Sequence, residues 1–113
     1  MIEACHFGSM DIGGCRYHAD LKIVDGRVVP DWWRQQAHVL DVLDVDDILA
    51  AAPEILVVGM GQPGMLRVAD SLRATLVDRG IELIEEPTAG AAKSFNRFYL
   101  EGKHVAAAFH LTC

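Results

Sequence analysis

Ile55-Leu56-Val57-Val58-Gly59-Met60-Gly61-Gln62-Pro63-Gly64 is the stretch of sequence that decides how this chain folds. Its first four residues form a continuous apolar run, which is typical of a strand covered on both faces of a sheet. The glycine-rich turn ends that strand. Apolar residues then recur at helical spacing over residues 69–79. The stretch therefore predicts a strand–turn–helix unit of an α/β domain.

The C-terminal third continues this alternation of strands and helices. Residues 81–84 predict a second strand, and residues 104–109 predict a final one. Between them we expect a helix that Thr88 caps, with Ala92, Phe95 and Tyr99 as its buried stripe. Strands that alternate with helices in this way pair mostly in parallel and carry the helices on their faces.

The N-terminal half consists instead of short apolar segments joined by tight turns. A strand is expected over residues 2–7, and Gly13-Gly14 and Asp25-Gly26 each predict a hairpin. A short strand over residues 38–43 follows, and then a helix that begins at the acidic residues 44–47. We therefore predict a single α/β domain, residues 1–113, in three layers. A mixed, mostly parallel central sheet carries the helices, and N-terminal hairpins add an extra β-layer.

Composition and charge exclude several classes of function. Ten basic side chains against sixteen acidic ones give a net charge of −6, which argues against nucleic-acid binding because that depends on clustered Lys and Arg. No apolar stretch reaches the length of a membrane span or a signal peptide. Three cysteines without close pairing indicate a reducing compartment. We therefore expect a cytoplasmic protein that binds neither nucleic acid nor membrane.

The glycine turn matches the pattern G-x-G-x-x-G, and Glu85 follows where an acid would meet the ribose in a dinucleotide fold. However, only one strand–helix–strand unit surrounds the motif, and a helix that begins near residue 69 starts too late to point its N-terminus at a pyrophosphate. We interpret Gly59–Gly64 as a strand-end turn at the floor of any cleft. A small ligand or anion held by Gly59, Gly61, Gly64 and Thr88 is the alternative.

Trp32-Trp33-Arg34, with His38 nearby, forms a second group of interest. One indole is expected to be buried and the other to border a pocket. The Arg34 guanidinium could form bidentate hydrogen bonds with a carboxylate or phosphate ligand, or a structural ion pair with an acidic residue. The complete candidate ligand-binding set is Trp33, Arg34, His38, Gly59, Gly61, Gly64 and Thr88.

His110 and Cys113 have the spacing H-x-x-C, which raises the question of a thiolate–imidazole nucleophile or half a metal site. In an extended segment, residues three apart face opposite sides. Two ligands also fall short of the four that a structural zinc site requires. We therefore predict no catalytic residue, no metal and no cofactor.

Several segments along nearly the whole chain together carry a resemblance: Trp33-Arg34 with His38, Val57–Gly61, Gly80–Glu82, Glu86–Ala89, Phe95-Asn96 and Ala106–Cys113. In this order they resemble a small α/β domain family, widespread in bacteria and archaea. It includes an assembly factor of mitochondrial respiratory complex I and an adipogenesis-associated cytosolic protein. The resemblance implies a three-layer fold with a mixed sheet, and neither an established catalytic activity nor a cofactor.

Resemblance and sequence together favour a non-enzymatic interaction or assembly module with a protein partner. A domain or enzyme that binds a small ligand, an anion or nucleotide, around Gly59–Gly64 is the alternative. The sequence does not determine the oligomeric state.

Overall fold

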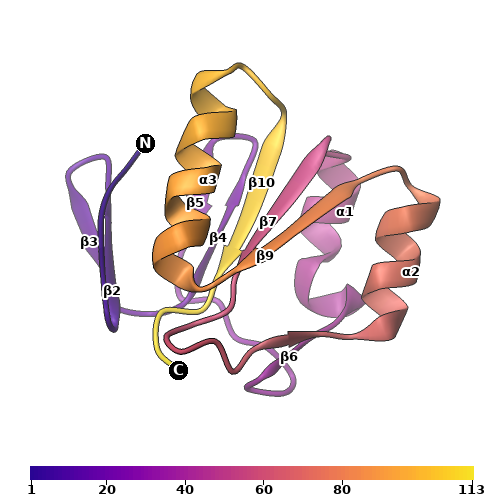
Figure 1. The fold of residues 1–113 in the computed structure, drawn as a ribbon, viewed down its shortest axis with the longest axis horizontal. Coiled ribbons are helices and arrows are strands. Elements are labelled where there is room, and N and C mark those ends of the chain that lie inside the picture. The colour runs from indigo at the N-terminus through magenta and orange to yellow at the C-terminus, as the bar shows by residue number, and fades with distance from the viewer.

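A five-stranded sheet forms the centre of the computed structural model, which describes residues 1–113 (Figure 1). Its strands lie in the order β5 (Arg27–Val29), β4 (Leu21–Val24), β10 (Val105–Phe109), β7 (Ile55–Gly59) and β9 (Glu82–Glu86). The pairings β10–β7 and β7–β9 are parallel, whereas β4–β10 and β4–β5 are antiparallel. The predicted mixed sheet is confirmed, but it is not mostly parallel, because two of its four strand pairings are parallel and two are antiparallel. Its antiparallel half is contributed by the Asp25-Gly26 hairpin.

The central strands β7 and β10 are buried on both faces, as the apolar run of β7 predicts. Ile55 and Val57 face one hydrophobic core, whereas Leu56 and Val58 face the other. The alanines of β10, Ala106–Ala108, alternate between the same two cores. Full burial of a Val, Leu or Ile side chain contributes about 1.5–3 kcal/mol, so both layers are held firmly to the sheet.

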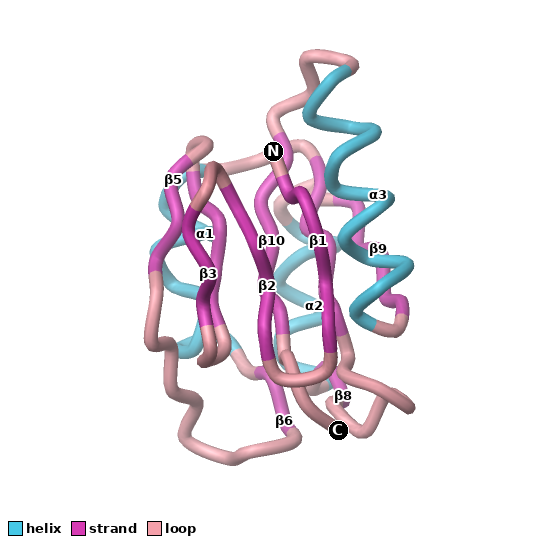
Figure 2. The backbone as a smooth tube through the Cα atoms, turned by 90° about the vertical axis from the view of Figure 1, so that its left-hand side faces the viewer, coloured by secondary structure: helices cyan, strands magenta, loops and turns pink.

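One face of the sheet is covered by two elements side by side (Figure 2). These are α3 (Thr88–Leu100) and a three-stranded antiparallel sheet of β1 (Ile2–His6), β2 (Ser9–Ile12) and β3 (Cys15–Tyr17). The Asn96 side chain ties them together, because it accepts a hydrogen bond from the Ile2 N–H at 2.9 Å and donates one to the Ile2 carbonyl at 2.7 Å.

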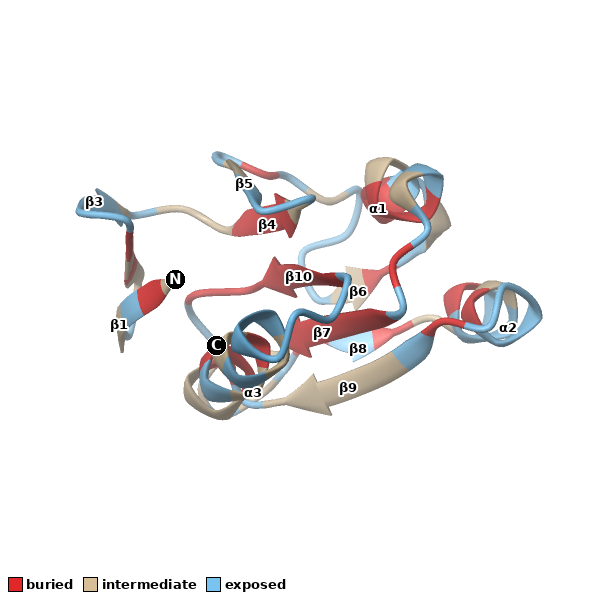
Figure 3. Cartoon of the chain, turned by 90° about the horizontal axis from the view of Figure 1, so that it is seen from above, coloured by how far each residue is buried: buried red, intermediate tan, exposed pale blue.

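The opposite face carries the 3₁₀ helix η1 (Val42–Val45) and the helices α1 (Asp46–Ala51) and α2 (Asp70–Asp78) (Figure 3). Two short strands, β6 (Val39–Leu40) and β8 (Arg67–Val68), pair in parallel near them. The three-layer α/β fold is thus confirmed, but the N-terminal strands β1–β3 share a layer with α3 and do not form an additional one. None of the helices has the length and apolar character needed to cross a bilayer.

Two details of α3 differ from the prediction. Thr88 does not cap the helix: it is the first helical residue, Pro87 is the N-cap, and no side chain makes a capping bond. The Thr88 hydroxyl is instead buried in contacts with Gly61 and His110. Tyr99, expected in the buried stripe, is 43% exposed near the C-terminal end of the helix, where one face of its ring stacks on the buried Phe95.

The segment 38–43 also differs, because only Val39 and Leu40 form a strand. The Asp41 side chain accepts a hydrogen bond from the Val42 N–H, and Asp44 accepts one from the Asp41 N–H. This reciprocal capping box starts η1 where the alternating pattern predicts more strand. The following helix, α1, begins at Asp46 within the acidic run that predicts its N-terminus.

Candidate functional site

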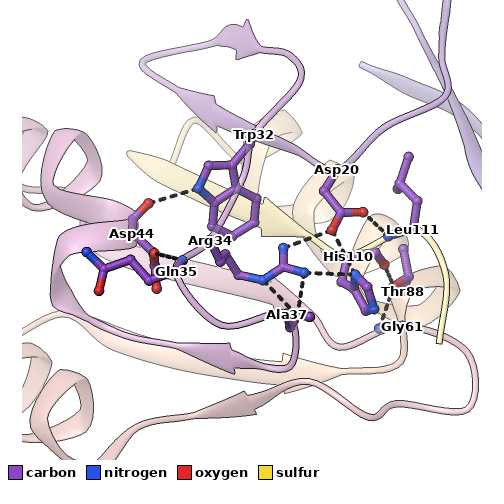
Figure 4. Close-up of polar contacts among 10 residues, drawn as sticks. All are labelled: Asp20, Trp32, Arg34, Gln35, Ala37, Asp44, Gly61, Thr88, His110 and Leu111. Carbon is purple, nitrogen blue, oxygen red and sulfur yellow. Dashed lines mark hydrogen bonds and ion pairs between the residues drawn. The ribbon is translucent and has the colours of Figure 1, made fainter.

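The glycine turn lies at the carboxyl ends of β7 and β10, against the C-terminal segment, residues 110–113. The Gly61 N–H donates to the Thr88 hydroxyl at 2.9 Å, and that hydroxyl donates to the His110 carbonyl (Figure 4). The Gln62 N–H donates to the Thr112 carbonyl at 2.8 Å. These amides of the turn therefore bind other parts of the same chain.

Close packing explains the glycines at positions 59 and 61. A Cβ atom on Gly61 would lie 2.5 Å from the Thr112 carbonyl oxygen and 2.8 Å from the His110 Cδ2, and its φ of +96° already disfavours other residues. A Cβ on Gly59 would lie 2.6 Å from the Phe109 ring. A Cβ on Gly64, by contrast, would meet no atom closer than 3.9 Å, although the φ of +108° still favours glycine there.

The turn does not lead directly into a helix. Residues 65–69, which include β8, separate Gly64 from the first residue of α2, Asp70. The helix that follows the turn in the chain, α2, therefore does not place its N-terminus at the turn, as a dinucleotide fold would to hold a pyrophosphate. The helix that begins beside the turn is α3, and the N–H of its first residue, Thr88, donates to the Gly61 carbonyl at 3.3 Å. The geometry supports the interpretation of Gly59–Gly64 as a strand-end turn.

Beside the turn, Arg34 forms the centre of a polar cluster (Figure 4). Its Nη1 lies 2.8 Å from the Asp20 Oδ2, and its Nε and Nη2 donate to the Ala37 carbonyl at 3.1 and 2.6 Å. The guanidinium carbon lies 4.9 Å from the centre of the Trp32 ring, a cation–π arrangement. The Arg34 side chain is only 5% exposed. Of the two roles predicted for Arg34, anion binding and a structural ion pair, the structure shows the ion pair, with Asp20.

Asp20 accepts two further hydrogen bonds within this cluster. Its Oδ2 lies 2.8 Å from the His110 Nδ1, and its Oδ1 accepts from the Leu111 N–H at 2.8 Å. Burial by itself would raise the pKa of Asp20, but the hydrogen bonds from His110, the Leu111 amide and Arg34 outweigh it and lower that pKa. Asp20 is therefore a carboxylate, which accepts hydrogen bonds only.

His110 is 5% exposed, and its second ring nitrogen, Nε2, is buried without a hydrogen-bond partner in the chain. The exposed ring of His38 lies against it, with ring centroids 5.5 Å apart at an angle of 82°. The structure thus pairs His110 with Asp20, a partner that the H-x-x-C spacing does not indicate. No three histidine, cysteine or acidic side chains are grouped as a metal site would require.

A cleft of about 530 Å³ opens beside this cluster. Asp20, Arg34 and His110 line it, together with Trp32, Trp33 and Thr112. Trp33 is 83% exposed, whereas Trp32 is buried and donates from its Nε1 to the Asp44 carbonyl at 3.0 Å. One buried and one exposed indole is the arrangement expected from the sequence.

The structure brings most of the predicted site residues together. Gly61, Thr88, Arg34 and His38 each contact His110, and Gly59 packs against Thr88. Trp33 borders the neighbouring cleft, and Gly64 lies on the more open side of the turn. Asp20 is absent from the predicted set, because a single acid before a short strand carries no spacing signal in the sequence.

Comparison with known families agrees with this fold. The family described as "Protein of unknown function (DUF498/DUF598)" matches residues 2–110. This chain belongs to the DUF498/DUF598 family. The match extends over β1 to β10 and includes both Asp20 and His110.

Solved structures share the DUF498/DUF598 architecture. The conserved hypothetical protein PH1505 from Pyrococcus horikoshii OT3 is 28% identical with a TM-score of 0.84, over 100% of this chain and 99% of that one. The structure named MT938 is also 28% identical, with a TM-score of 0.83 over 100% and 98%. An outer membrane protein from Bartonella henselae is 20% identical with a TM-score of 0.81, over 99% and 94%, which shows a shared fold alone.

Proposed function

We propose that this chain is a cytoplasmic, non-enzymatic interaction or assembly module whose protein partner binds around Trp33. The observation that carries the proposal is the 83% exposure of this indole at the rim of the cleft. Tryptophan is enriched among the residues that dominate binding energy at protein interfaces. An indole left in water beside a buried neighbour therefore suits a partner-binding role.

Two more exposed apolar side chains, Phe7 and Met65, lie at the same end of the molecule. Phe7 precedes Gly8, whose N–H donates to the Leu111 carbonyl, and the Met65 N–H donates to the Cys113 carbonyl, both at 2.8 Å. Phe7 is 66% exposed and Met65 is 50% exposed. Phe7, Met65 and Trp33 thus lie near the C-terminal segment, at the end of the molecule where we place the protein partner.

The polar groups beneath the rim support the same proposal. The Arg34 side chain and the Gly61 amide already bond within the chain, so they offer few free donors to an anion. The resemblance to an assembly factor of respiratory complex I and to an adipogenesis-associated cytosolic protein points in the same direction. It supports an assembly role, without supplying the partner.

Affinity capture from extract of the source cells tests the proposal. We expect the unmodified protein to retain a stoichiometric partner and Trp33→Ala to lose it, by about 30-fold or more if Trp33 contributes about 2 kcal/mol. Leu100→Ala is the matched control, since Leu100 is 81% exposed at the C-terminal end of α3. Repeated failure to recover any partner, or equal capture by Trp33→Ala, would contradict the proposal.

A small-ligand domain or enzyme with a site at the strand ends is the second candidate. The unpaired His110 Nε2 next to Gly61 favours it. Thermal unfolding in the presence of nucleotides, phosphate and small carboxylates tests this candidate. A ligand at 100 times its Kd stabilises the folded state by about 2.7 kcal/mol. A flat screen at millimolar concentrations would exclude these three ligand classes.

A further inference from the structure

The His110 imidazole is held in one orientation with one nitrogen left over. The Asp20 carboxylate lies 2.8 Å from Nδ1 and only accepts hydrogen bonds, which assigns the ring proton of the neutral imidazole to Nδ1. The Arg34 Nη2, which only donates, lies farther from the same atom, at 3.2 Å, and already donates to the Ala37 carbonyl at 2.6 Å, so the shorter Asp20 contact decides the position of the proton. The free lone pair therefore resides on Nε2.

A buried nitrogen without a partner is energetically unfavourable. Leaving a polar group unpaired in the interior costs about 1–3 kcal/mol, and the large majority of buried side-chain polar atoms in proteins have a hydrogen-bond partner. The His110 Nε2 is the single buried side-chain nitrogen or oxygen in the chain that lacks a hydrogen bond. The lone pair on this atom is a ready acceptor for an incoming O–H or N–H group.

The surroundings of His110 are suited to a small planar molecule. Trp32, Trp33 and His110 line the same cleft, whose volume of about 530 Å³ lies within the usual range for small-molecule sites. Asp20 and Arg34 neutralise each other within it. We propose that this cleft binds a small neutral aromatic ligand whose hydroxyl or N–H group donates a hydrogen bond to the His110 Nε2.

We assign to His38 the role of a gate to this acceptor. Nε2 is closed to solvent, and the His38 ring lies edge-on against the His110 ring. His38 itself is exposed, and exposed side chains change rotamer within nanoseconds. The ligand reaches Nε2 when the His38 ring turns aside, so removal of this ring strengthens binding.

Phenol and anisole form a matched pair of probes, because both carry the same ring and only phenol donates a hydrogen bond. Titration of the unmodified protein is followed by the imidazole ¹⁵N resonances in long-range ¹H–¹⁵N NMR spectra. We expect phenol to shift the His110 Nε2 resonance saturably at millimolar concentrations. Anisole should bind about five- to tenfold more weakly, the ratio that one hydrogen bond supplies, and should leave Nε2 unshifted.

Variants test the same contact independently. His110→Phe should reduce the affinity for phenol to that for anisole, and His38→Ala should increase it. His104→Phe is the control, because His104 also pairs with an aspartate, Asp25 at 2.8 Å, but lies away from the cleft. Equal binding of phenol and anisole to the unmodified protein would overturn the proposal, even if His110→Phe does not fold. An unshifted Nε2 resonance with phenol, or weaker phenol binding by His38→Ala, would also overturn it.

Discussion

The Asp20 carboxylate lies 2.8 Å from the His110 imidazole, although 90 residues separate the two in the sequence. The register of the antiparallel pair β4–β10 explains this proximity. Leu21 lies opposite Phe109, so the residue before Leu21 and the residue after Phe109 face each other at the end of the ladder. A contact at the end of two central strands thus joins the N-terminal half of the chain to its last strand.

Asp20→Asn should destabilise the protein by about 3 kcal/mol, because it removes the negative charge that compensates the largely buried Arg34. Urea unfolding measures the change. Asp11→Asn is the control: Asp11 pairs with Arg16 on the surface, at 2.8 Å, and such pairs contribute about 0–1 kcal/mol. Equal losses in the two variants would show that the Asp20 cluster has no special structural role.

The stability that Asp20 contributes should depend on pH in a defined direction. Its pKa in the folded state is lowered, so its contribution is complete above the unfolded-state pKa, which is about 3.9. The contribution is lost as the pH falls below that value toward the folded-state pKa. The difference in unfolding free energy between the unmodified protein and Asp20→Asn should therefore shrink below about pH 4. A difference that stays constant between neutral and acidic pH would contradict this assignment.

Gly61→Ala should be much more destabilising than Gly13→Ala. Both glycines have positive φ, +96° and +59°, but a Cβ on Gly13 meets no atom within 4 Å. Gly13→Ala should therefore cost about 1–2 kcal/mol for the left-handed backbone alone. The Cβ of Gly61→Ala adds the overlap with Thr112 and His110, about 1–3 kcal/mol more. Thermal or urea unfolding measures the difference in unfolding free energy between the two variants. Similar values would indicate that the C-terminal segment moves to accommodate the added Cβ at little cost.

Thr88→Val should destabilise the protein by about 2 kcal/mol or more, because it leaves the buried Gly61 N–H and the His110 carbonyl without their partner. Thr75→Val is the matched control. The Thr75 hydroxyl donates to the Ser71 carbonyl on the exposed side of α2, and water can replace it there. Denaturant unfolding of both variants tests the difference. A neutral Thr88→Val would mean that the turn is held without this hydroxyl.

Replacement of the two adjacent tryptophans, Trp32 and Trp33, should affect the unfolding free energy very differently. Trp32→Ala should cost about 3–5 kcal/mol, because this ring is buried and its Nε1 bonds to the Asp44 carbonyl. Trp33→Ala should change the unfolding free energy by less than about 0.5 kcal/mol, since the side chain is mostly in solvent. A large loss from Trp33→Ala would assign that ring a packing role and weaken its use as a partner contact.

Much of the fold is predictable from local patterns. The apolar run of β7 predicts a strand buried on both faces, and the spacing of apolar residues predicts α2 and the N-terminal two-thirds of α3. These predictions succeed because burial of a periodic apolar face dominates the local choice between helix and strand. They fail where a polar side chain finds a local partner, as Asp41 does with Asp44.

Less of the candidate site than of the fold is predictable from the sequence. Sequence by itself determines the α/β architecture and the glycine turn after β7, and it offers Arg34, His38 and Thr88 as candidate site residues. It does not determine which acid pairs with Arg34, because sixteen acidic residues are available and no spacing distinguishes Asp20. Only the tertiary structure decides that Asp20 meets His110 and that Nε2 stays unpaired. Strand register places these groups together, and pairing between distant strands leaves no periodic signal along the chain.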